Sequence, residues 1–119
     1  MLQRPARSVN GMFRAFSDPT QLRILNLLRA GELCVCDLTT VMDVPQPTAS
    51  RHLAYLRRAG LVRARRSGVW SYYALVPPRS AFHRKLLDCL ESCFRDVPEL
   101  ERDAERARRM NVRRGDCPA

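Results

Sequence analysis

The sequence lacks the features of a membrane or secreted protein. No apolar run approaches the roughly 18 residues that cross a bilayer. The first residues, MLQRPARSVNGMFRAF, contain neither the apolar region nor the small-residue cleavage site of a secretion signal. Five cysteines are an odd number, which argues against a closed disulfide framework. We therefore expect a cytoplasmic protein with no membrane partner and with reduced thiols.

The usual signatures of an enzyme are also scarce. The five glycines are scattered and form no phosphate-binding loop, and there are just two histidines. No Cys-x-x-Cys pair follows a predicted strand, which argues against a redox enzyme. We predict no catalytic residues, and at 119 residues we expect a core large enough to fold without disulfides. The expected domains are residues 1–97, which form the main folded unit, and residues 98–119, a charged C-terminal tail.

Acidic residues are missing from the middle of the chain. None lies between Asp43 and Asp88, whereas the net charge of the whole chain is +9. The segment carries nine cations: Arg51, Arg57, Arg58, Arg63, Arg65, Arg66, Arg79, Arg84 and Lys85. The twelve other cations equal the twelve acids in number, so the net charge lies in this segment. Such a concentration indicates a nucleic-acid surface, with a merely solvated basic face as the alternative.

Apolar spacing and breaker residues divide the chain into helices, a turn and a hairpin. Residues 1–8 are expected to form a loose tail. The expected helices cover residues 9–16, a segment from Pro19 to a stop at Gly31, a segment from within ELCVCDL to Met42, and residues 48–59, 80–97 and 99–110. Residues 44–47 contain two prolines and are expected to form a turn. Gly60 is expected to end the helix of residues 48–59. Strands are expected over residues 61–66 and 69–76, joined at Ser67–Gly68.

Two short helices across a tight turn, followed by a hairpin, predict a winged helix-turn-helix. The fold class is therefore mainly α with a small β-hairpin. The second helix would enter the major groove of double-stranded DNA and the hairpin arginines would contact flanking phosphates. The predicted DNA-binding residues are Gln46, Thr48, Ser50, Arg51 and His52 on the helix and Arg63, Arg65 and Arg66 on the hairpin. For each one, helix capping or ordinary surface exposure is the alternative.

Three stretches together resemble the ArsR/SmtB family of metal-responsive transcriptional repressors. They are DPTQLRILNLL, ELCVCDL and QPTASRHLAYLRRAGLVRARRSGVWSYYAL, and the likeness is greatest to the arsenic-responsive branch. The resemblance implies a homodimer, joined through the first and last core helices, that represses its own resistance genes. It implies release from operator DNA when As(III) binds, with Sb(III) or trivalent organoarsenicals as other inducers, and no permanent cofactor.

Within this likeness, Cys34 and Cys36 are the predicted ion ligands. Soft thiolates select thiophilic ions, and a helix N-terminus favours the thiolate form, although Asp37 opposes it. Residues at i and i+2 point about 200° apart on a regular helix, so both can face one ion only where the first precedes the helix. A buried reduced pair remains the alternative.

A third thiolate is not evident from the sequence. In the arsenic-responsive branch a third cysteine often follows three residues after the second, but here that residue is Thr39. The ligand could come from Cys89, Cys93 or Cys117, although Cys89 and Cys93 also fit the apolar seam of a packed helix. Sensing of cadmium, lead or thiol oxidation by the same fold is the alternative function. A DNA-binding protein without a ligand is a further one.

Overall fold

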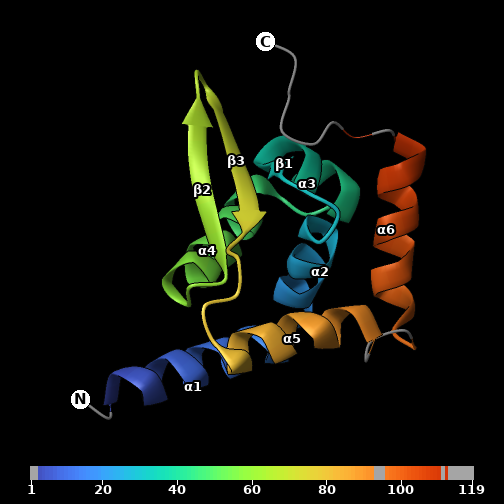
Figure 1. The fold of residues 1–119 in the computed structure, drawn as a ribbon. Coiled ribbons are helices and arrows are strands. Elements are labelled where there is room, and N and C mark those ends of the chain that lie inside the picture. Colours follow the sequence, from blue (N-terminus) through green and yellow to red (C-terminus); the bar gives the residue numbers. More distant parts are fainter. Residues whose placement is uncertain (1–2, 93–95, 111, 113–119) are drawn as a thin grey trace.

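Helices lie beneath and beside a small sheet, from which a hairpin projects, in the computed structural model of the chain, which describes residues 3–92, 96–110 and 112 (Figure 1). The elements in chain order are α1 (Gln3–Ser17), α2 (Pro19–Leu28), β1 (Leu33–Cys34), α3 (Val35–Met42), α4 (Gln46–Arg58), β2 (Val62–Ser67), β3 (Trp70–Leu75), α5 (Ala81–Ser92) and α6 (Pro98–Met110). This order confirms the predicted winged helix-turn-helix class. Within the described ranges no helix is long and apolar enough to span a membrane.

Proline and aspartate residues are found at the starts of the two N-terminal helices. The predicted loose tail is wrong for residues 3–8, because α1 already begins at Gln3. Pro5 falls in its first turn, where a missing N–H costs no helical hydrogen bond. α2 begins as predicted, since the Asp18 carboxylate accepts a hydrogen bond from the Gln21 backbone N–H at 3.0 Å and Pro19 takes the first helical position.

The turn between α3 and α4 is built by Asp43 and Pro45. Asp43 adopts a left-handed backbone with φ of 56°, which aspartate tolerates better than most residues. Val44 N–H then donates to the carbonyl of Thr39 and closes the end of α3. α4 begins at Gln46, two residues before the predicted start, because Pro47 is accommodated in its first turn. Gly60 follows α4 with φ of 81°, as a helix terminator should.

The sheet contains one strand that the sequence patterns did not predict. β2 and β3 form the expected antiparallel hairpin, and Gly68 supplies the left-handed turn conformation with φ of 62°. β1 adds to the other edge of β3, so the strand order is β1-β3-β2. The residue immediately before α3 is thereby joined to the hairpin.

One apolar core joins the helices to the sheet. Its largest wholly buried side chains include Ile24, Leu25, Leu27, Leu33, Leu38, Leu53, Leu56 and Leu61. These come from α2, β1, α3, α4 and the start of the hairpin, so every element of the helix-turn-helix is fixed to the same interior. Burial of this kind removes apolar area from water and is the main force that holds α4 in place.

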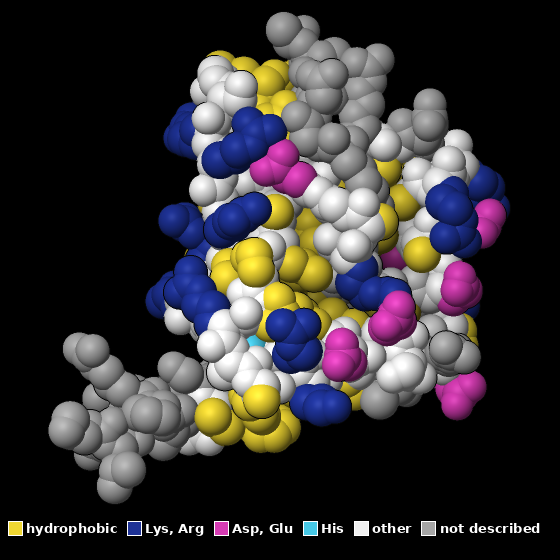
Figure 2. All heavy atoms as spheres, viewed as in Figure 1, with side chains coloured by type: hydrophobic (Ala, Val, Ile, Leu, Met, Phe, Trp, Pro, Cys, Tyr) yellow, Lys and Arg dark blue, Asp and Glu magenta, His cyan; other side chains and the backbone are white. Residues whose placement is uncertain are grey.

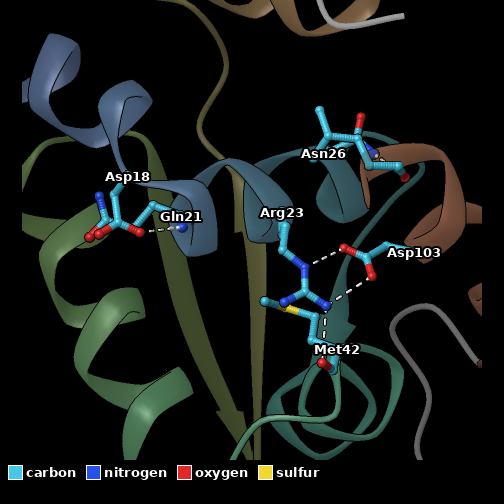
Figure 3. Close-up of polar contacts among 7 residues, drawn as sticks. Asp18, Gln21, Arg23, Asn26, Met42 and Asp103 are labelled. Carbon is cyan, nitrogen blue, oxygen red and sulfur yellow. Dashed lines mark hydrogen bonds and ion pairs between the residues drawn. The ribbon is translucent and has the colours of Figure 1, made fainter. Parts of the chain in front are cut away.

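α6 is docked on the core, although the sequence suggested a charged tail. Arg23 of α2 donates to both carboxylate oxygens of Asp103, at 2.7 and 3.0 Å, and to the carbonyl of Met42 at 3.0 Å (Figure 3). The hydrogen bond with Asp103 raises the pKa of Arg23. Asn26 donates to the carbonyl of Leu100 as well. These contacts fix α6 against α2 and the end of α3; a domain boundary at residue 97 stays a prediction.

A buried histidine at the start of α5 gives folding a dependence on pH. His83 is 1% exposed, its Nδ1 accepts from the Arg79 backbone N–H at 3.3 Å, and its Nε2 meets no partner in the described part of the chain. Burial, and secondarily Arg79, lowers the pKa of His83 below its ordinary value near 6.5. The folded state therefore holds this imidazole neutral.

Stability is expected to fall as the pH drops below about 6.5 because of His83. Below this pH the His83 side chain is protonated in the unfolded chain but stays neutral in the folded chain. The free energy of unfolding therefore falls by at most about 1.4 kcal/mol per pH unit, until the pH reaches the pKa of His83 in the folded chain. Urea unfolding at pH 7.5 and 5.5 measures this. The variant His83→Leu should show a smaller difference between the two pH values, and an equal difference would assign the effect to other groups.

Candidate DNA-binding surface and thiol site

The polar start of α4 lies on the same side of the molecule as the basic wing strand. Gln46, Ser50 and Arg51 are exposed near the N-terminal end of α4, whereas Ala49 and Leu53 face the core. Figure 2 shows Lys and Arg side chains gathered along the edge where Figure 1 places α4 and β2. A helix about 10–12 Å across with short polar side chains at its start fits a major groove about 12 Å wide.

Two of the α4 residues that are predicted to bind DNA are less exposed than the others. Thr48 is half-buried. His52 is turned toward α2, where its Nδ1 lies 3.0 Å from the Oε1 of Gln21 and 3.9 Å from the carboxylate of Asp18. Because an amide oxygen only accepts, Nδ1 carries the proton and donates. His52 thus links α4 to the start of α2, and its contact with DNA stays a prediction.

The three wing arginines differ in their surroundings. Arg63, Arg65 and Arg66 are all exposed on β2. Arg65 donates to both carboxylate oxygens of Glu32 at 2.8 Å, and its guanidinium carbon lies 4.4 Å from the centre of the Tyr72 ring. The hydrogen bond with Glu32 raises the pKa of Arg65. Within the described residues Arg63 and Arg66 form no such ion pair, so they are the wing residues best placed for phosphate.

Cys34 and Cys36 meet at the start of α3. Cys34 is wholly buried and is the N-cap of the helix, with extended backbone, and its Sγ accepts from the Cys36 N–H at 3.2 Å. The structure joins the two sulfurs in a disulfide, with Cα atoms 5.3 Å apart. The expected helix start is confirmed, and it brings both sulfurs to one place despite their i, i+2 spacing. The form able to bind an ion is the reduced one.

A complete three-ligand site is not assembled within the described residues. No group of three His, Cys, Asp or Glu side chains able to hold a metal occurs among them. Cys89 lies half-buried on α5, whereas Cys93 and Cys117 fall outside the residues that the structure describes. The hydroxyl of Thr39 donates to the carbonyl of Cys36 at 2.8 Å. A third thiolate from any of these cysteines stays a prediction.

Glu32 and Tyr72 were not predicted as site residues. Glu32 holds Arg65, and Tyr72 lies directly opposite Cys34 in the β1–β3 register. The sequence contains a weak signal for the first of these: Glu32 is the one acid between Asp18 and Asp37, in a stretch rich in apolar residues. The pairing with Tyr72 depends on β1, whose two residues show no strand pattern.

Comparison with known proteins identifies relatives of this arrangement. Residues 18–64 match the family model described as "Bacterial regulatory protein, arsR family". The chain is 46% identical over 78 residues to an uncharacterized HTH-type transcriptional regulator of Methanocaldococcus jannaschii, covering 65% of this chain and 88% of that protein. It is 47% identical over 78 residues to the arsenical resistance operon repressor of Escherichia coli K12, covering 65% of this chain and 67% of that protein.

Solved structures show the same architecture. The NMR structure of a homodimeric winged helix-turn-helix DNA-binding domain from Mycobacterium bovis, described as a possible ArsR-family regulator, matches with a TM-score of 0.66. The two are 28% identical, and the match covers 82% of this chain and 87% of that one.

Proposed function

Because the chain belongs to the ArsR family of bacterial transcriptional regulators, we propose that it represses transcription as a homodimer on operator DNA and is released when trivalent arsenic binds Cys34 and Cys36. The family consists of DNA-binding regulators and not of enzymes. The observation that carries the proposal is the position of the two sulfurs at the first turn of α3, the helix that directly precedes the recognition helix α4.

DNA binding is supported by the charge and shape of the α4–β2 side. Gln46, Ser50 and Arg51 would contact base edges or nearby phosphates, and Thr48 and His52 would support the start of the helix. Arg63 and Arg66 would contact the backbone, and Arg65 would join them while its pair with Glu32 holds it in position. Phosphate contacts give affinity, while α4 gives sequence preference.

Dimerisation is supported by apolar side chains where α1 meets the start of α5 (Figure 1). The ring of Phe13 is 55% exposed and packs edge-on against Phe82, with centroids 5.1 Å apart. An exposed aromatic ring beside a half-buried one favours burial against a second copy. A homodimer of this kind would place two α4 helices about 34 Å apart, one turn of DNA, on an inverted repeat.

Ion binding is supported by the chemistry of the pair. Reduced thiolates are soft ligands that take As(III), Sb(III) or a trivalent organoarsenical, with an oxygen, a carbon or a further thiolate as the third ligand. The ion would need the Cys34 sulfur that now caps α3. Binding would therefore disturb the beginning of the helix that supports α4.

The proposal is tested by operator binding of the reduced protein with arsenite, antimonite, cadmium, lead and peroxide in parallel. We expect a dimer on an inverted repeat, an affinity that falls steeply with salt, and release by arsenite at lower concentration than by cadmium or lead. The result against it would be unchanged DNA affinity in saturating arsenite, with Cys34 and Cys36 shown to be reduced by thiol counting.

Response to thiol oxidation is the second candidate, and the Cys34–Cys36 disulfide favours it. A peroxide would take two electrons and two protons from the two thiols, leaving a disulfide and two molecules of water or one water and one alcohol. In the same assay, release by peroxide that dithiothreitol reverses, without release by arsenite, would identify this function instead.

A further inference from the structure

A row of side chains connects the thiol site to the wing across the sheet. In the antiparallel register Cys34 pairs with Tyr72, and Tyr72 pairs with Arg65. Residues directly opposite one another on antiparallel strands point to the same face, so these three form one cross-strand row. Glu32 lies just before β1, two residues before Cys34, and its carboxylate contacts Arg65 of this row.

Arg65 contacts both Tyr72 and Glu32. Its guanidinium lies over the Tyr72 ring, 4.4 Å from the centroid, and reaches beyond it to Glu32 with two hydrogen bonds of 2.8 Å. A two-point contact of this type fixes direction as well as distance. The wing strand β2 is thus held directly to the segment that carries Cys34, although β3 lies between the two in the sheet.

An ion bound to Cys34 would disturb the contacts of this cross-strand row. The side chain is wholly buried beside its paired residue Tyr72, which is itself 3% exposed. An ion several ångströms across cannot approach the sulfur unless Cys34 moves away from its neighbours, because the interior is close-packed. β1 contributes two residues to the sheet, so few ladder hydrogen bonds resist this displacement.

We propose that Glu32, Arg65 and Tyr72 transmit ion binding at Cys34 to the wing, so that the inducer changes the DNA contacts of the hairpin as well as those of α4. This inference rests on the proposed function. Displacement of β1 separates Glu32 from Arg65, and the wing loses the contact that sets its position. Glu32 and Tyr72 act here as positioning residues and touch neither the ion nor DNA.

The variant Glu32→Gln tests this route, because glutamine keeps the size of the side chain but not the charge that holds Arg65. Operator affinity without ion is expected to fall by about threefold to fivefold, because the variant already lacks the contact that the ion would break. Arsenite affinity of the free protein is expected to stay within about twofold of wild type. The factor by which arsenite weakens DNA binding should fall by about threefold to fivefold, in proportion to the modest strength of an exposed pair. By reciprocity, the factor by which DNA weakens arsenite binding should fall equally.

Trp70 gives a second readout that a purely structural role would not change. It is the single tryptophan of the chain and lies at the end of the wing, paired with Ser67. Arsenite should change its fluorescence in the wild type, and this change should be smaller in the Glu32→Gln variant at equal occupancy of the thiols.

The matched control is Glu105→Gln, which removes the same charge from an exposed ion pair with Arg108 on α6. It should leave the arsenite response unchanged. The inference is overturned if Glu32→Gln releases DNA as the wild type does, if both variants lose response equally, or if Glu32→Gln no longer binds arsenite, which would make Glu32 part of the ion site. Absence of arsenite release in the wild type would instead overturn the proposed function itself.

Discussion

Replacing Cys34 or Cys36 by serine is expected to abolish release of operator DNA by arsenite and to leave DNA binding intact. One remaining thiolate loses the advantage of two ligands joined by a short segment, which is worth a factor of about 10² to 10⁴ in affinity. Cys34→Ser suits the fold, because a serine hydroxyl can accept the Cys36 N–H bond that the Cys34 sulfur now accepts, and serine is a preferred N-cap. Operator binding with and without arsenite measures both effects.

The control for these variants is Cys89→Ser. Cys89 lies half-buried on α5, and no third ligand joins Cys34 and Cys36 within the described residues. The apolar seam predicted for this helix implies packing, so arsenite release should persist. If Cys89→Ser dimerises and binds DNA normally but no longer responds to arsenite, α5 supplies the third thiolate. Normal arsenite release by both single variants, Cys34→Ser and Cys36→Ser, would exclude the thiol pair as the sensor.

The helix-turn-helix could be predicted from the sequence because its signals are local. Asp18 and Pro19 begin α2, Gly60 ends α4, and Gly68 makes the hairpin turn. Each of these acts through its own backbone conformation or hydrogen bonds within one turn of chain. Apolar spacing then places the inner faces of the helices, so the order of elements follows without tertiary contacts.

The connections between the elements could not be predicted because they join residues far apart in the chain. β1 has two residues, too few for an alternating pattern, and it exists through pairing with β3, which lies beyond two intervening helices. Arg65 appears in sequence as one of several basic wing residues, and only the fold brings Glu32 to it. His52 is predicted to contact DNA, and only the fold shows that its hydrogen-bond partner is Gln21 of α2. The elements that carry the candidate site were thus predictable, whereas the contacts between its residues required the structure.

Replacing Arg51 by alanine is expected to weaken operator binding more than any other single change on α4. Arg51 is exposed, lies in the N-terminal half of the helix and forms no ion pair within the described residues. A guanidinium that binds guanine or phosphate contributes about 1–3 kcal/mol, and a homodimer loses it twice, so the expected loss is about 2–6 kcal/mol. Fluorescence anisotropy with a labelled operator measures the affinity, and arsenite binding should be unchanged.

The salt dependence of the Arg51→Ala variant identifies what the side chain reads. If it binds phosphate, the slope of log affinity against log salt should fall by about one per subunit and random DNA should be weakened equally. If it binds a base, the slope should stay and the preference for the operator should fall. The matched control is Arg106→Ala on α6, on the far side of the molecule from α4 in Figure 1, which removes the same charge and should change affinity by less than about twofold. Equal losses in the two variants would mean that overall charge, and not the α4 surface, determines binding.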